Sequence, residues 1–285
     1  MIVNGIIGGL IMGGILSLPV LGVAVVYGIT GVPNFAIGLI GVMGGFTTWM
    51  FFKQNMALAI FIGIGMCFPI GYFLQRLILT PMSKKGADST LFFLVTISLG
   101  FVFQGLIRNI YPQLTIGLTL PRLGVINLGG VALDGIKFIA LIFAILLLVI
   151  IRLLEQHTKA GKSLQATSQN LKLATLFGIN TKLVFSLAHG LGCALAGVGA
   201  IFWGSLYNLD LNTGWELGFV GFIVAVIGGI GNIWGGMISA LIMGMVLSFS
   251  GYLLGGVWQS VMLYGIVILV LIVAPRGILG SERSL

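Results

Sequence analysis

Charged residues are scarce in this chain, and acidic residues are the scarcest of them. Only 7% of the 285 residues are charged, and Asp and Glu together number six. A soluble domain carries about a quarter of its residues as charged side chains, so an ordinary soluble fold is excluded. With two histidines and no acidic cluster, the chain also has little with which to hold a metal ion.

Cysteine is rare as well. Cys67 and Cys193 both lie inside apolar runs, where we expect small core residues, so no disulfide framework is implied. The N-terminal MIVNGIIGG lacks a basic region and is followed by no small-residue cleavage site. We therefore interpret the first apolar segment as a membrane span and not as a removed signal.

Apolar residues and glycine make up most of the chain. Hydrophobic residues make up 58% of the chain, glycines number 45, and the mean hydropathy is +1.17. We predict an all-α polytopic membrane protein, one transmembrane domain over residues 1–285, with about eight or nine spanning or partly broken helices of roughly 20 residues. The apolar segments lie at about 5–30, 34–52, 56–79, 89–110, 135–154, 183–206, 216–231, 233–252 and 257–274.

The basic residues predict an orientation in the membrane. If the spans alternate, most of the 14 Lys and Arg fall on one face, namely Arg76, Lys84, Lys85, those between 152 and 182, Arg276 and Arg283. Lys53, Arg108, Arg122 and Lys137 fall on the other. The positive-inside rule places the larger set and the C-terminus in the cytoplasm, and the N-terminus outside. The net charge of +8 is thus assigned to membrane orientation and not to nucleic-acid binding.

Two apolar segments are interrupted, one in each half of the chain. Residues 28–46 break at Pro33 and Asn34, and residues 213–236 hold a short apolar run that ends in Gly228 and Gly229. Such corresponding breaks suggest an internal repeat and a solute pathway, because broken helices offer free backbone groups within the membrane. The helix starts at Asn34 and near Trp215 could then hold a carboxylate. A tight turn and glycines that only pack helices would explain the same pattern.

Polar residues inside the spans are few: Thr96, Ser98, Gln104 and His189. An intramembrane polar side chain faces a pathway or another helix. For Thr96 and Ser98 a bond to their own helix is the simpler explanation, whereas Gln104 is harder to satisfy locally. His189 lies near the predicted cytoplasmic end of its span and is more typical of a core or interface residue than of a ligand.

The apolar pattern stops for one long stretch between Arg152 and Lys182. Residues 163–177 contain no Gly or Pro, and we predict one helix there, capped by Ser163 and ended by Gly178. Leu164, Leu171 and Ala174 would share one apolar edge. A cytoplasmic helix of this kind is suited to docking on another protein, although a solvated basic loop fits the composition equally well.

Catalytic motifs are not convincing. Ala160–Ser163 resembles the end of a P-loop, but residue 156 is Gln where the first Gly is required, and no strand precedes it. The chain is therefore interpreted as a passive conduit with a docking element.

Six stretches together resemble the permease subunits of high-affinity branched-chain amino-acid ABC importers. They are Pro33-Asn34-Phe35-Ala36-x-Gly38, Pro81 with Lys84-Lys85, Thr96-Ile97-Ser98-Leu99-Gly100 with Gln104, Gly161 through Gly178-Ile179-Asn180, Ala225 through Gly231 with Gly235, and Pro275-Arg276-Gly277-Ile278-Leu279-Gly280. They span nearly the whole chain in the order of the family.

The resemblance implies a multi-pass subunit in a bacterial inner membrane. Its partners would be a second permease, identical or homologous, two cytoplasmic ATPases that bind ATP and Mg, and an external substrate-binding protein; this chain itself would carry no cofactor and no catalytic or metal site. The coupling segment would lie at about 155–182, with ATPase contacts from Gly161, Leu164, Ala166, Gln169, Asn170, Leu171, Ala174, Phe177 and Gly178. The pathway would be lined by Asn34, Phe35, Thr96, Ser98, Gln104, Gly228 and Gly229.

Two departures from the family pattern affect what is inferred. Ile37 stands where the family commonly has His, which leaves the solute open between branched-chain or other hydrophobic amino acids and urea, amides or small organic acids. Leu164 or Gln165 holds the place of a common Arg in the coupling segment. An ATP-independent channel is the first alternative, and a membrane-bound transferase is the second; the latter lacks a nucleophile with His or acid partners.

Overall fold

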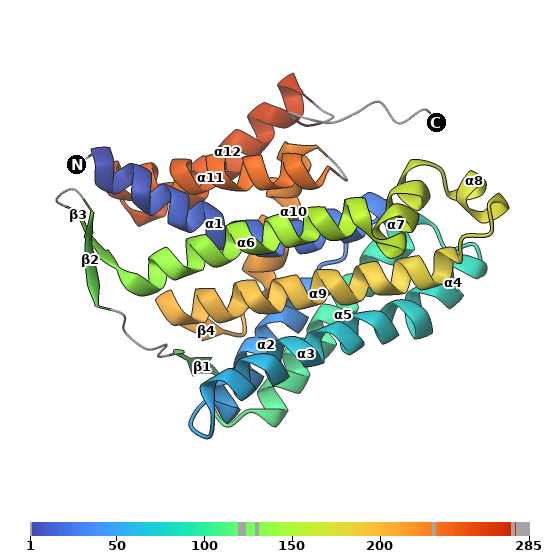
Figure 1. Cartoon of the computed structure of the whole chain (residues 1–285), viewed down its shortest axis with the longest axis horizontal. Helices are drawn as coiled ribbons and strands as arrows, with labels where there is room; N and C mark the ends of the chain where they lie inside the picture. The colour runs from blue at the N-terminus through green and yellow to red at the C-terminus, as the bar shows by residue number, and fades with distance from the viewer. Residues whose placement is uncertain (1, 119–123, 129–130, 230–231, 275–276, 278–285) are drawn as a thin grey trace.

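The computed structural model describes residues 2–118, 124–128, 131–229, 232–274 and 277. Helices dominate, and most of them run between two ends of the molecule (Figure 1). They are α1 (Ile2–Thr30), α2 (Ala36–Phe51), α3 (Met56–Leu74), the π-helix η1 (Gln75–Leu79), α4 (Thr80–Lys84), α5 (Ser89–Ile110), α6 (Gly135–His157), α7 (Lys159–Gln169), α8 (Leu171–Leu176), α9 (Thr181–Leu206), α10 (Thr213–Gly228), α11 (Ile233–Leu253) and α12 (Gly256–Val273).

The described residues also include four short strands. Strand β1 (Thr115–Ile116) pairs antiparallel with β4 (Leu209–Asp210), and β2 (Val125–Leu128) pairs antiparallel with β3 (Val131–Asp134). All four lie away from α4, α7 and α8 in Figure 1. We call the end with α4, α7 and α8 the basic end and the end with the strands the opposite end.

Each of the nine apolar segments predicted from sequence forms a helix. Six helices in the described part of the chain are long and apolar enough to cross a bilayer, whereas α2 and α10 have only 16 residues each. Helix α2 follows the predicted interruption at Pro33 and Asn34, and α10 ends at the predicted interruption at Gly228 and Gly229. The all-α polytopic fold is therefore confirmed, while the number of complete crossings stays a prediction.

Small residues bring the central helices close together. A Cβ on Gly22 of α1 would meet the backbone of Gly192 in α9, and one on Gly38 of α2 would meet Gly214 and Gly218 in α10. Close backbone approach through glycine is the usual way in which helices associate where lipid removes the hydrophobic drive. The abundance of glycine is thus a packing requirement at these positions.

One long helix from each half of the chain packs on helices of the other half. Helix α1 packs on α10 and α11, and α9 packs on α2 and α3. Helices α1 and α9 are themselves antiparallel neighbours, since Gly22 lies at Gly192 and Pro19 lies at Gly199. This is the pairing pattern that an inverted repeat would produce.

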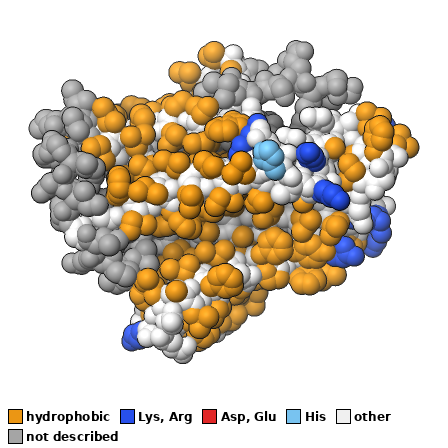
Figure 2. All heavy atoms as spheres, in the orientation of Figure 1, with side chains coloured by type: hydrophobic (Ala, Val, Ile, Leu, Met, Phe, Trp, Pro, Cys, Tyr) orange, Lys and Arg blue, Asp and Glu red, His pale blue; other side chains and the backbone are white. Residues whose placement is uncertain are grey.

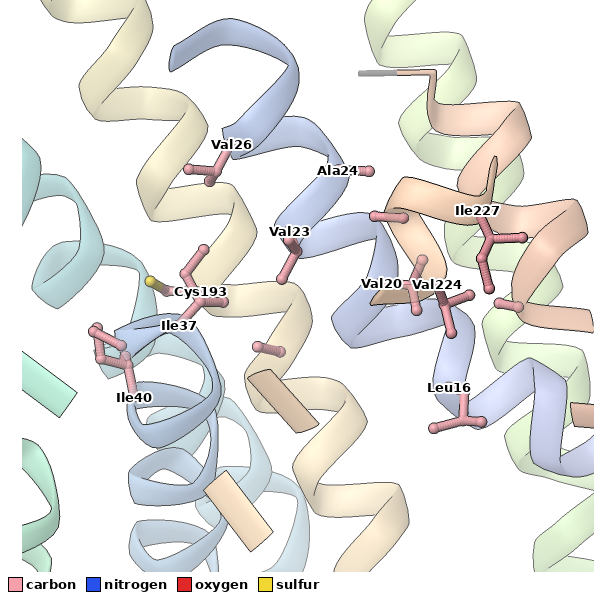
Figure 3. Packing of buried hydrophobic residues seen from close by; sticks show 14 of the residues in the cluster. Leu16, Val20, Val23, Ala24, Val26, Ile37, Ile40, Cys193, Val224 and Ile227 are labelled. Carbon is pink, nitrogen blue, oxygen red and sulfur yellow. The ribbon is translucent and has the colours of Figure 1, made fainter. Parts of the chain in front are cut away.

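The largest buried cluster lies where α1, α2, α9 and α10 meet. Val20 of α1 lies beside Val224 of α10, and Ile37 of α2 lies beside Cys193 of α9, with Val23 of α1 between the two groups (Figure 3). Cys193 and Cys67 are both fully buried and unpaired, as the sequence predicts.

The surface divides as expected for a membrane protein. Apolar side chains cover the middle of the face shown in Figure 2, and Lys and Arg gather at the basic end. The basic end carries Arg76, Lys84, Lys85, Arg152, Lys159, Lys162, Lys172 and Lys182. Lys53 and Arg108 lie at the opposite end. Arg122, Arg276 and Arg283 lie outside the described residues, as does the side chain of Lys137.

The single helix predicted for residues 163–177 is wrong. Asn170 has extended backbone (φ −154°, ψ 104°), ends α7 and caps α8 by accepting a hydrogen bond from Leu173 N at 3.0 Å. The start is also wrong, because Thr158 caps α7 and Ser163 Oγ only donates to Lys159 O. The predicted stop is right. Gly178 has φ +79°, and Ile179 N donates to Ala174 O, which closes the helix as a C-terminal glycine commonly does.

Candidate functional site

The break between α1 and α2 places a polar side chain in the protein interior. Pro33 cannot donate a backbone hydrogen bond, and Gly31 has φ +68°, so the chain turns before α2 begins. Asn34 is 4% exposed, and its Oδ1 accepts from Ala36 N at 3.0 Å. Its Nδ2 has no hydrogen-bond partner among the described residues. An unpaired buried donor costs free energy, so this one calls for a ligand or a water.

A second unpaired polar atom lies on η1. Thr80 N donates to Gln75 O across a π-turn, and Gln75 Nε2 donates to Thr80 Oγ1 at 3.3 Å. Gln75 is 5% exposed, and its Oε1 accepts nothing from the described residues. Single π-turns inside helices are frequent at functional sites because they redirect side chains and free backbone groups.

Asn34 and Gln75 line the same cavity near the basic end, which we call the inner cavity. It has a volume of about 320 Å³. Its wall is formed by Ile29, Thr30, Val32, Pro33, Asn34, Gln75, Leu79, Thr80, Ser83, Lys84, Phe92, Thr96, Leu171, Thr175, Thr181, Lys182, Phe185 and His189. The two residues that carry the unpaired donor and the unpaired acceptor therefore line one space, together with apolar side chains and two lysines.

Thr96 and His189 are two polar members of the cavity wall. Thr96 Oγ1 lies 2.9 Å from Phe93 O and 3.3 Å from Pro33 O, a carbonyl that the helix break leaves without a helical partner. His189 is 1% exposed and pairs through Nδ1 with Phe185 O at 3.1 Å. Thr96 thus joins α5 to the break, which places the predicted pathway residues Asn34 and Thr96 together.

The other predicted pathway residues lie elsewhere. Phe35 contacts Phe93 and Phe219 in a row of rings that continues through Trp215 to Phe101. Gln104 is joined to this row, since its Oε1 accepts from Trp215 Nε1 at 3.3 Å and its Nε2 contacts Leu211 O at 3.5 Å. Ser98 is exposed on the outer side of α5 and bonds only to Leu94 O. This aromatic row therefore leads from the inner cavity toward the opposite end.

Gly228 and Gly229 form the end of α10 and do not line the inner cavity. A Cβ on Gly228 would meet the backbone of Gly235, and Gly229 has φ +104°. Gly277, beyond α12, packs against Gly229 and Val226. The structure accounts for these glycines by close packing of the α10–α11 turn, and their place on a solute route stays a prediction.

At the start of α10 a carboxylate of the chain itself occupies the outermost N–H groups, and the binding of a solute carboxylate at this helix end stays a prediction. Asp210 Oδ1 accepts from Thr213 N at 2.7 Å and from Asn212 N at 3.0 Å. The chain supplies its own carboxylate to this helix end, as is common where backbone N–H groups are left unpaired.

The predicted coupling residues divide between two sides of α7 and α8. Gly161 is buried against the backbone of Leu154 and Glu155, Leu164 packs against Val25, Ile29 and Ala188, and Ala174 is 2% exposed. Asn170 caps α8, Ala166 is partly buried, and Gln169 and Gly178 are exposed. The predicted shared edge of Leu164, Leu171 and Ala174 is therefore wrong, because the helix breaks between them and two of the three face inward.

A different set of apolar residues is exposed on α8. Leu173, Leu176 and Phe177 are 51%, 82% and 83% exposed. Leu171 and Thr175 on the same short helix belong to the wall of the inner cavity. Helix α8 thus has one side on the cavity and another side without cover.

Sequence reasoning missed Gln75, Leu173 and Leu176. The sequence shows Gln75 as a polar residue within an apolar run, but no sequence pattern indicates the π-turn on which it lies. Leu173 and Leu176 were not predicted as an exposed apolar surface, because one continuous helix was assumed. The break at Asn170 changes the face on which each later residue lies.

Comparison with known proteins agrees with this architecture. Residues 5–272 match the family described as branched-chain amino acid transport system / permease component. The high-affinity branched-chain amino acid transport system permease protein BraD of Pseudomonas aeruginosa is 27% identical over 98% of this chain and 95% of its own length. LivH of Escherichia coli, of the same description, is 28% identical over 96% of this chain and 94% of its own.

An archaeal relative extends the comparison. The probable branched-chain amino acid transport permease protein LivH of Methanocaldococcus jannaschii is 28% identical over 96% of this chain and 91% of its own length. No solved structure matches the chain. Since one family covers nearly every described helix, the chain belongs to the permease components of branched-chain amino acid transport systems.

Proposed function

We propose that this chain is the membrane permease subunit of an ATP-driven importer for a small amino acid, with branched-chain or other hydrophobic amino acids as the favoured solutes. The names of the relatives support the solute class. The observation that carries the proposal is helix α8, which lines the inner cavity through Leu171 and Thr175 and exposes Leu176. One element thus connects a solute-sized space to a surface suited to a partner.

The inner cavity suits the two charged groups of an amino acid. Asn34 Nδ2 is an unpaired donor and fits a carboxylate, whereas Gln75 Oε1 is an unpaired acceptor and fits an ammonium group. Ile29, Val32 and Phe92 of the same wall provide contact for an apolar side chain. The cavity volume of about 320 Å³ lies at the lower end of the roughly 300–1,000 Å³ typical of ligand sites, as a small solute requires.

The partners follow from the exposed surfaces. Two cytoplasmic ATPases, which would bind ATP and Mg, are assigned to α8 and its exposed Leu173, Leu176 and Phe177. A second permease subunit is assigned to the side formed by α5 and α10, where the exposed Ser98 and Glu216 would be costly against lipid. An external binding protein would deliver the solute at the opposite end, and the C-terminus would be cytoplasmic. No role in binding nucleic acid is proposed.

The test of this function is uptake together with ATPase recovery. Leu176→Asp should abolish ATP-dependent uptake into vesicles supplied with the binding protein, because a charge replaces an exposed apolar contact. It should also reduce co-purification of the ATPase. Leu114→Asp is the matched control for ATPase recovery, since Leu114 is 43% exposed near β1 at the opposite end.

The outcomes separate the alternatives. Normal uptake by Leu176→Asp, with the ATPase still bound, would remove α8 as the docking element. Uptake that persists without any ATPase would identify an ATP-independent channel. Competition of labelled leucine uptake by urea, amides or small organic acids as effectively as by isoleucine would move the solute away from amino acids.

A further inference from the structure

A second cavity lies on the side of the molecule, between α6, α7 and α9, and we call it the lateral groove. Its volume is about 680 Å³, and its wall includes Ile151, Leu154, Leu187, Leu191 and Leu195. Leu154 and Leu191 are 47% and 41% exposed, so the groove communicates with the apolar surface seen in Figure 2. It shares no lining residue with the inner cavity.

The groove changes from apolar to cationic along its length. Leu191 and Leu195 lie within the span of α9, whereas Thr158, Lys159 and Ala160 form the start of α7 at the basic end. The first N–H groups of an α-helix have no partner within the helix and favour an anion. Thr158 Oγ1 caps only Gly161 N, at 3.0 Å, so the N–H groups of Lys159 and Ala160 receive no side-chain cap in the described structure.

The charges around this end favour a negative group. Glu155 is the acid in the wall, and it is engaged by Arg152 at 2.9 Å and by Gln165 Nε2 at 3.1 Å. Arg152 also lies over the ring of Trp234. Lys159, by contrast, is exposed and has no carboxylate within ion-pair distance among the described residues. The groove therefore presents a long apolar wall that ends at an unneutralised cation.

We propose that the lateral groove binds one anionic phospholipid from the leaflet at the basic end. An acyl chain lies along Leu154, Leu187 and Leu191, and the headgroup phosphate lies at Lys159 and the start of α7. Basic pockets between membrane helices on the cytoplasmic side recognise anionic headgroups in this way. The wall also includes Gly161, Leu164 and Gly178 of the segment proposed to couple to the ATPase, so a bound lipid would brace that segment against α9.

The experiment measures lipid binding directly. The full-length chain, purified in detergent, is titrated with phosphatidylglycerol or phosphatidylcholine and examined by native mass spectrometry. Phosphatidylglycerol should bind several-fold more tightly than phosphatidylcholine. Lys159→Gln should weaken phosphatidylglycerol binding about fivefold, the fold-change that corresponds to about 1 kcal/mol for one basic residue near an anionic lipid. Lys172→Gln, an exposed lysine on α8 outside the groove wall, should change nothing.

A second variant tests the apolar part of the groove. Leu191→Trp should fill the space and reduce binding of both lipids, whereas Leu253→Trp, at an exposed position on α11, should not. Equal affinity for the two lipids, or unchanged binding by Lys159→Gln, would show only a non-specific lipid shell. Displacement of the lipid by glycerol phosphate at the lipid's own concentration would show a free-phosphate site. Either result would overturn the proposal.

Discussion

At the scale of single residues, the strongest indication of a ligand comes from two buried side-chain atoms without hydrogen-bond partners, Asn34 Nδ2 and Gln75 Oε1. The sequence marks Asn34 because Pro33 and Asn34 interrupt an apolar run. Its position on the same cavity wall as Gln75 was not predictable, since the two residues are far apart in sequence and Gln75 belongs to a π-turn that no sequence pattern marked. Sequence pattern reveals a break in a helix, but it does not reveal which side chain lies across the gap.

Asn34→Asp should impair transport while preserving the fold. Aspartate keeps the Oδ1 acceptor for Ala36 N but replaces the Nδ2 donor with a negative oxygen, which would repel a solute carboxylate. Loss of a hydrogen bond to a charged group costs about 1.5–3 kcal/mol, so uptake should fall by about tenfold or more. Asn55→Asp makes the same change at an exposed cap of α3 and should transport normally. Equal uptake by both variants would contradict the assignment of Asn34.

Gly228→Ala should reduce stability more than it alters solute recognition. The added methyl group would meet the backbone of Gly235, which cannot move aside as a flexible side chain could. Overpacking of this kind costs about 1–3 kcal/mol, so the thermal midpoint in detergent should fall. Gly65→Ala is the control, because a Cβ there meets nothing within 4 Å. An unchanged midpoint with lost uptake would return Gly228 to the solute route.

At the scale of helices, sequence analysis located the elements well and one junction badly. Long apolar segments are recognisable as helices from sequence. The breaks at Pro33 and at Gly229 are also recognisable, because proline and glycine have unusual backbone preferences. The junction at Asn170 contains no Gly or Pro. The cost of interrupting the helix there is offset by one side-chain cap and by burial of Ala174. Burial depends on tertiary packing, which the helix propensity of the local sequence does not describe.

Asn170→Ala should loosen α8 without unfolding the membrane helices. Removal of an N-cap typically costs about 1 kcal/mol, and alanine favours continuation of α7 into α8. Leu171 and Thr175 would then leave the wall of the inner cavity. We expect weaker coupling of ATP hydrolysis to uptake, measured as more ATP consumed per solute transported. Asn180→Ala, which removes the cap of α9 at Leu183 N, is the comparison for loss of a cap alone. The same ratio in both variants would count against a special role of the Asn170 junction.

At the scale of the whole molecule, the basic residues predict the orientation, and the structure makes the test simple. Ser83→Cys at the basic end should react only with a thiol reagent added from the cytoplasmic side, and Gln113→Cys at the opposite end only from outside. Both positions are exposed, whereas Cys67 and Cys193 are fully buried and should stay unlabelled. Labelling of Gln113→Cys from the cytoplasm would reverse the topology.

The internal repeat also belongs to this scale. Sequence suggests it through two interrupted segments, and the exchanged pairings of α1 with α11 and of α9 with α3 support it. Sequence identity between the two halves was not detectable. Close helix packing requires small residues at single positions, and it does not require a shared motif. The repeat therefore stays a prediction about ancestry, although the pairing itself is a feature of the structure.

The double position of α8 has a thermodynamic consequence. Leu171 and Thr175 belong to the inner cavity, while Leu176 and Phe177 on the same helix end are uncovered. If a partner that docks on this helix changes the affinity of the cavity for its solute, then the solute must change the affinity for the partner by the same factor. Occupancy of the cavity would thus be reported to the far side of α8, and a loaded permease and an empty one would hold their ATPases with different strengths.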